Sequence, residues 1–189
     1  LLPTAGLLLA MLARMAPEDR QRRILEINWK DVLTRLGEAH PAAAAARDAP
    51  DAGLPTALEA LQGAGLIEVD RPDVDPAPTT YTVHPGVAEA ARAEADPAVL
   101  DAVDVEMGNF HIAMVRRALS DEMEGQGSVV TGSARRAAPY LLRQKRWREA
   151  STLLEWMLQR DRSPSTLAFA LPLLRSIAAA TAGTERELI

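Results

Sequence analysis

Residues 79–92, TTYTVHPGVAEAAR, constrain the fold most strongly, because their pattern changes from strand to helix within a few positions. The first five are β-branched or aromatic, as a short strand favours. Pro85 suits the first position of a helix, and the alanines and valine that follow give that helix an apolar side. The sequence therefore predicts a strand that runs directly into a helix, with His84 at the junction.

The segments that precede this junction predict two helices, a linker, a third helix and a first strand. Apolar residues at helical spacing predict a helix over residues 7–15 and a second that begins at Pro17 and ends before Gly37. The alanine-rich residues 38–53, bounded by prolines and a glycine, are predicted to form a linker loop. Residues 54–63 and 66–69 then predict a helix and a strand. Helix, strand, loop, strand, helix is the pattern of a winged helix-turn-helix, which we expect over residues 1–95.

The remaining chain predicts helices alone. Asp96 and Pro97 open a long apolar stripe, so residues 96–126 are predicted to be a connecting helix. Two helical patterns separated by only three residues, 144–146, predict an antiparallel hairpin within residues 127–189, followed by the start of a further repeat. We thus expect a mainly α fold in which a winged helix with a small β-hairpin is joined by a long helix to an antiparallel helical array.

The net charge and the composition argue against several classes of binding partner and site. The 189-residue chain has a formal net charge of −5, which disfavours general affinity for nucleic acid or an anionic membrane surface. It has no cysteine, so disulfides and thiolate sites are excluded, and a cytoplasmic location is the simplest interpretation. The apolar N-terminal run is interrupted by Arg14, too early for a membrane span.

Two features of this sequence argue against sequence-specific DNA binding. The helix at residues 54–63 occupies the recognition position, and its predicted exposed residues, Thr56, Glu59, Ala60 and Gln62, include one amide and one carboxylate but no arginine or lysine. The wing at residues 70–78 carries three aspartates and a single arginine. Its spacing lacks the glycine and the terminal glutamate of a calcium loop, so no metal site is predicted there.

The predicted hairpin resembles a tetratricopeptide repeat. Ala138 and Leu141 would hold the small and large positions of its first helix, Trp147 the aromatic position at the turn, and Ala150 and Leu154 the small and bulky positions of its second helix. Met157 and Pro164 depart from the pattern. A basic cluster accompanies the hairpin and suits either a solvated helix face or the binding of an acidic segment or RNA; it comprises Arg135, Arg136, Arg143, Lys145, Arg146 and Arg148.

A winged helix without basic character, a long helix and a repeat-like array together resemble the middle of STAND signalling proteins, the NB-ARC-like ATPases. The resemblance implies that His84, in the triplet Val83, His84 and Pro85, corresponds to the family histidine that approaches the β-phosphate of bound ADP. Pro85 replaces the family aspartate and Val83 the methionine.

These observations predict a regulatory and scaffolding segment without a catalytic site. The sequence contains no phosphate-binding loop, so any ADP or ATP would be held by a nucleotide-binding domain upstream in the same longer, bacterial-type chain, while the helical repeats bind a protein partner. One alternative is a winged-helix transcription regulator with a helical effector or dimerisation domain. A second is a repeat-type adaptor that binds other proteins.

Overall fold

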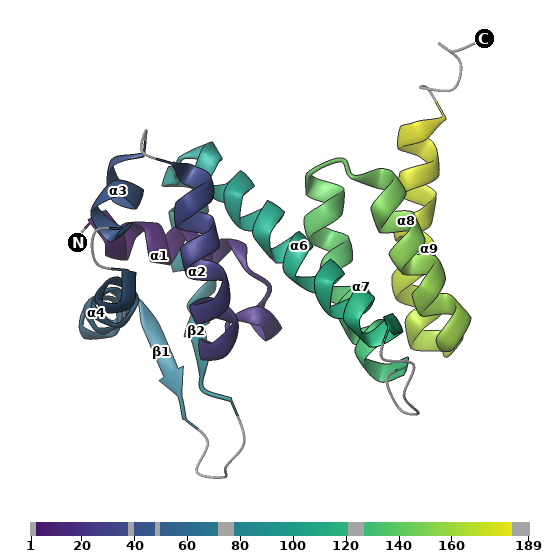
Figure 1. Ribbon diagram of the computed structural model, residues 1–189, viewed down its shortest axis with the longest axis horizontal. Helices are drawn as coiled ribbons and strands as arrows, with labels where there is room; N and C mark the ends of the chain where they lie inside the picture. The colour runs from purple at the N-terminus through teal and green to yellow at the C-terminus, as the bar shows by residue number, and fades with distance from the viewer. Residues whose placement is uncertain (1–2, 38–39, 48–49, 72–77, 121–126, 183–189) are drawn as a thin grey trace. The chain divides into compact units, whose positions relative to one another are not determined.

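A computed structural model describes residues 3–37, 40–47, 50–71, 78–120 and 127–182. The chain divides into two compact units, unit 1 (Leu1–Glu106) and unit 2 (Met107–Ile189) (Figure 1). Both are mainly helical, and unit 1 also holds a small antiparallel sheet. The predicted mainly α fold with one β-hairpin is therefore confirmed.

Helix α1 is the centre of unit 1. It packs against α3, α4 and α5, and its buried residues include Leu8, Met11 and Leu12, each fully inaccessible to solvent. This arrangement follows from the wide apolar face of α1, which a single neighbouring helix cannot cover. The elements of unit 1 are α1 (Pro3–Arg14), the short 3-10 helix η1 (Pro17–Asp19), α2 (Arg22–Leu36), α3 (Pro41–Arg47), α4 (Pro50–Gly63), β1 (Ile67–Asp70), β2 (Thr80–Val83), α5 (Pro85–Glu94) and the first part of α6 (Pro97–Ser120).

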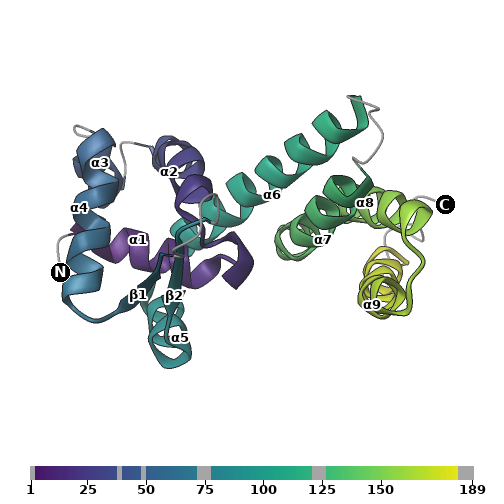
Figure 2. The same cartoon turned by 90° about the horizontal axis from the view of Figure 1, so that it is seen from below.

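Strands β1 and β2 pair antiparallel, with Ile67 opposite Val83 and Glu68 opposite Thr82. The first of these pairs is buried and the second exposed, as expected for a sheet with one face on the core. Figure 2 shows the two strands between α2 and α5. Residues 70 and 80 end the paired segment, and the acidic wing predicted between them lies largely at residues 72–77, outside the described part of the chain.

A third segment extends this sheet and was not predicted. Gln21 forms an antiparallel bridge with Thr80. The amide of Arg22 donates to the carbonyl of Thr79 at 2.9 Å, and the amide of Tyr81 donates to the carbonyl of Arg20, also at 2.9 Å. The prediction that the second helix begins at Pro17 is therefore wrong: Pro17 starts only η1, and α2 begins at Arg22 because Gln21 is extended and bridged to β2.

The predicted linker loop at residues 38–53 is also wrong for most of its described residues, which form α3 and the first part of α4. Alanine is the strongest helix former, and Ala43 and Ala46 are buried, so close packing replaces the missing large side chains. Pro50 is the first residue of α4, where its missing N–H has no cost. The same helix continues through Pro55, with Leu54, Ala57 and Leu61 buried.

Two arginines of unit 1 pair with acidic residues in the first part of α6. Arg14, at the end of α1, donates through Nε to both carboxylate oxygens of Asp104 at 3.0 Å. The side chain of Asp104 is only 3% exposed, whereas that of Arg14 is 23% exposed. Arg35, at the end of α2, pairs with Glu106 and is 43% exposed. The side chain of Glu106 is 14% exposed, so the second ion pair is less buried than the first in both of its partners.

Unit 2 contains the rest of α6, α7 (Gly127–Arg143), α8 (Trp147–Arg160) and α9 (Pro164–Thr181). Helices α7 and α8 are joined by the predicted residues 144–146 and pack closely, and α8 also packs against α9. Lys145 has φ 58° in the turn, and the amides of Lys145 and Arg146 donate to the carbonyls of Leu142 and Leu141, which satisfies the end of α7. Pro139 and Pro172 lie inside helices, so neither ends the helix that contains it. In the described residues, no helix is both long and apolar enough to span a membrane.

Gly37 ends α2 with φ 69° and ψ −174°, a region that only glycine adopts readily. We expect Gly37→Ala to destabilise unit 1 by about 1–3 kcal/mol through backbone strain. No atom lies within 4 Å of the position that the added Cβ would take, so a steric clash does not contribute. Gly6→Ala is the matched control, because Gly6 lies inside α1 with equally open space and ordinary φ. It is expected to stabilise by about 0.5–1 kcal/mol. Urea denaturation measures both, and equal effects would contradict this assignment of strain.

Candidate functional site

His84 is the N-cap residue of α5, directly after β2, and its side chain is exposed. Its Nδ1 atom accepts a hydrogen bond from the amide of Gly86 at 3.2 Å. An imidazole nitrogen that accepts carries no hydrogen, so the neutral ring holds its hydrogen on Nε2. The local fold therefore fixes the tautomer and leaves Nε2–H at the surface as a hydrogen-bond donor.

A cavity of about 480 Å³ adjoins this junction. Its wall contains all of β2 together with Pro85, so His84 lies between two lining residues, Val83 and Pro85. Arg20 and Arg92 also line the cavity, and none of the described lining residues is acidic. The site thus combines an N–H donor with a neighbouring cavity whose described lining includes two arginines and no acidic residue.

The two arginines are held by carbonyls near the end of α1. Arg20 is 8% exposed and donates from Nε and Nη2 to the carbonyl of Met15 at 3.2 and 3.1 Å. Arg92 donates from Nη1 to the carbonyl of Ala13 at 2.8 Å. Cations are favoured at the carbonyl end of a helix, so both side chains have a structural role at the end of α1. The sequence alone did not indicate these two arginines. Arg20 and Arg92 are 72 positions apart, and only the folded chain brings both to the end of α1.

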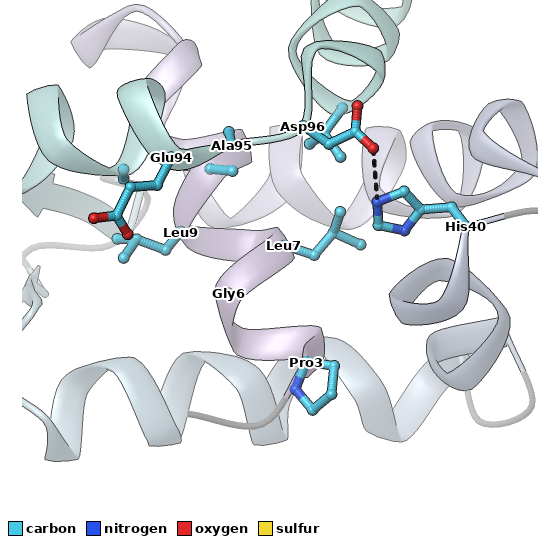
Figure 3. A pocket seen from close by; sticks show the side chains of 11 residues that line it. Pro3, Gly6, Leu7, Leu9, His40, Glu94, Ala95 and Asp96 are labelled. Carbon is cyan, nitrogen blue, oxygen red and sulfur yellow. Dashed lines mark ion pairs between the residues drawn. The ribbon is translucent and has the colours of Figure 1, made fainter.

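A second cavity, of about 360 Å³, lies between α1, the start of α3 and the junction of α5 with α6 (Figure 3). Figure 3 shows His40 facing Asp96, with Leu7 of α1 near them and Leu9 on the other side of the view beside Glu94. The Nε2 atom of His40 lies 3.9 Å from Oδ2 of Asp96, which suits an ion pair of a protonated ring but is too long for a hydrogen bond. Asp96 also accepts from the amide of Ala98 at 2.9 Å and so caps α6.

His40 directly precedes α3, and the fold places Asp96 opposite it. No signal in the sequence joins two residues so far apart. The pair is not a metal centre: among the described residues, no group of three or more histidine, aspartate or glutamate side chains is arranged to hold a metal ion.

His111 lies inside unit 2 and is 2% exposed. Its ring lies 5.1 Å from that of Phe110 and is stacked at 6.2 Å on that of Tyr140. This position makes it a core residue rather than a surface ligand.

The five residues predicted to pack the hairpin contribute to one core. Ala138, Leu141, Ala150 and Leu154 are all fully buried there, and Trp147 is partly buried against them at the start of α8. Ala138 of α7 and Ala150 of α8 are both buried in this core, and small side chains allow two helices to pack closely. The burial of these residues does not test the assignment to a tetratricopeptide repeat, which stays a prediction.

The predicted basic cluster is dispersed over unit 2. Arg135 lies over the ring of Phe169 at 4.7 Å and Arg143 over that of Tyr140 at 4.8 Å. Arg146 pairs with Glu149. These three members of the cluster therefore each have a partner within unit 2.

Comparisons of the chain with models of protein families, with curated proteins and with solved structures gave no match.

Proposed function

We propose that this chain is a regulatory segment of a STAND-type signalling protein, in which unit 1 is a winged helix that couples the nucleotide state to a helical sensor in unit 2. The observation that carries the proposal is the Nε2–H donor of His84, which is exposed beside a cavity lined by Arg20 and Arg92. Phosphate oxygens accept hydrogen bonds and are attracted to positive charge, so a phosphate group suits this combination.

The arrangement of unit 1 supports a winged helix. Its helices precede a two-stranded hairpin, and residues 20–22 add a third extended segment at the free edge of β2. A helix then leaves the second strand at once, with Pro85 at its first position. In the proposed mechanism, a nucleotide-binding domain of the same protein closes over this junction and places the ADP phosphate near His84. Loss of ADP removes this contact and shifts the population toward an open arrangement.

A DNA-binding regulator receives less support from the same unit. The exposed residues of α4 include Thr56, Glu59 and Gln62, so the helix offers one amide and one carboxylate to a groove. Salt-dependent binding of the chain to duplex DNA at near-physiological ionic strength would favour this alternative.

The test is the rate of ADP release from the intact natural protein after substitution of His84. His84→Ala removes both the cap and the donor, whereas His84→Asp keeps a cap acceptor for the Gly86 amide, removes the donor and adds a negative charge that repels phosphate. If the phosphate contact exists, both variants release ADP about tenfold faster or more, since a hydrogen bond to a charged group contributes about 1.5–3 kcal/mol.

A purely structural role gives a different result. The helix cap itself contributes about 0.5–2 kcal/mol of stability, which His84→Ala loses and His84→Asp retains. Normal ADP release from His84→Asp together with altered release from His84→Ala would show that His84 serves only as a cap. Thermal unfolding of the two variants of the 189-residue chain measures separately how much the helix cap contributes to stability.

A further inference from the structure

A second surface lies within unit 2, where a cavity of about 160 Å³ opens between α6 and α8. Ile112, Leu153 and Trp156 form its apolar part. Leu153 is buried and Trp156 only partly, so the indole remains accessible from the groove. Sites for drug-sized ligands have volumes of about 300–1,000 Å³, so this cavity suits one side chain rather than a small-molecule ligand.

Polar side chains surround that apolar part. Arg116 on α6 and Arg148 on α8 line the groove together with Thr152 and Glu149. Arg116 and Arg148 are exposed, and within the described residues neither side chain has a recorded hydrogen bond or ion pair.

The single carboxylate of the groove is already neutralised. Arg146 donates from Nε and Nη2 to the two oxygens of Glu149, both at 2.6 Å, and from Nη1 to Oδ1 of Asn109 at 2.9 Å. The hydrogen bonds from Arg146 lower the pKa of the Glu149 carboxyl, and the charge of Arg116 adds to this effect. Among the described residues that line the groove, no further carboxylate offsets the positive charges of Arg116 and Arg148.

We propose that this groove docks an acidic amphipathic segment of a partner protein, with one large apolar side chain inserted beside Trp156 and carboxylates placed next to Arg116 and Arg148. Tryptophan and arginine are the residue types that contribute most to protein interfaces, and here they surround one small pocket. RNA fits the groove less well. Backbone phosphates need a continuous basic track, whereas three other arginines of the hairpin, Arg135, Arg143 and Arg146, are engaged with Phe169, Tyr140 and Glu149. This inference goes beyond the proposed function and does not depend on nucleotide.

The probe is a fluorescein-labelled, helix-forming peptide with a central leucine and glutamates one turn to either side of it, titrated with the 189-residue chain. We expect saturable binding that weakens about tenfold when ionic strength rises from about 0.05 M to about 0.5 M. A peptide with glutamine in place of each glutamate, and another with alanine in place of the leucine, are each expected to bind about tenfold more weakly or worse.

Substitutions on the protein locate the site. Arg116→Gln and Arg148→Gln are each expected to weaken binding of the acidic peptide about three- to tenfold. The matched control is Arg175→Gln, which removes an exposed arginine of α9 outside the groove and is expected to leave binding unchanged. Circular dichroism checks that the exposed substitutions leave the fold intact, and Trp156→Phe tests the apolar part without opening a large cavity.

Three results would overturn the proposal. One is equal binding of the glutamate and glutamine peptides, and another is equal binding by the Arg148→Gln and Arg175→Gln variants. The third is binding of oligouridylate, reduced by Arg116→Gln and Arg148→Gln, without binding of the acidic peptide, which would assign the groove to RNA.

Discussion

Replacing Arg14 by methionine is expected to lower the free energy of unfolding of unit 1 by about 3 kcal/mol or more. The side chain of Asp104 is 3% exposed, and the guanidinium of Arg14 lies on both of its oxygens. Without Arg14, this carboxylate stays in a poorly solvated position and loses the compensating charge of the guanidinium. The loss thus reflects the desolvation cost of the remaining charge rather than the net contribution of the pair.

Arg35→Met is the matched control, because Arg35 pairs with Glu106 on the same part of α6 but is 43% exposed. Exposed ion pairs contribute about 0–1 kcal/mol, so a small effect is expected. The double variant Arg14→Met/Asp104→Leu should recover much of the loss, since an apolar pair leaves no buried charge.

Urea denaturation measures these stabilities. Trp29, buried in α2, reports unit 1 by fluorescence once Trp147 and Trp156 of unit 2 are replaced by phenylalanine. Equal effects of Arg14→Met and Arg35→Met would contradict the difference in burial between the two pairs.

Leu154→Ala is expected to destabilise unit 2 by about 2–5 kcal/mol. Leu154 is fully buried in the core that α7, α8 and α9 share, and its removal leaves a cavity among residues that already pack closely. The control is Leu171→Ala on α9, where the leucine is 41% exposed and the expected change is within about 0.5 kcal/mol.

Thermal unfolding followed by the fluorescence of Trp147 and Trp156, with Trp29 replaced by phenylalanine, measures the change in unit 2. A loss at Leu171 as large as that at Leu154 would show that the face of α9 bearing Leu171 is covered in solution. That result would contradict the assignment of the core to the inner faces of α7 and α8.

Sequence patterns predicted those helices and strands whose formation depends on residues within the element itself. The strand that runs into α5 carries its own β-branched residues and its own proline, and α8 has a clear apolar period between a turn and an exposed end. Residues 20–22 could not be assigned in this way, because their backbone partners belong to β2, about 60 positions along the chain. The alanines of α3 likewise give no periodic signal, and their burial depends on neighbouring helices.

The candidate site also has one part that the sequence predicts and another that depends on tertiary structure. The position of His84 at the junction follows from the sequence, since Pro85 and the preceding strand fix it. The tautomer of its ring and the arginines of the adjoining cavity do not, because they depend on the Gly86 amide and on the carbonyl end of α1. The facing positions of His40 and Asp96 also depend on tertiary structure alone.

The central claim is that His84 contacts nucleotide phosphate in one nucleotide state only. The most direct test is the NMR signal of the His84 imidazole Nε2–H in the intact natural protein labelled at histidine, assigned with His84→Asn and recorded with ADP and with a non-hydrolysable ATP analogue. The proposal predicts a signal that is protected from solvent exchange and shifted with ADP, and that returns to the exposed position with the analogue. An identical, solvent-exposed signal in both nucleotide states would contradict it.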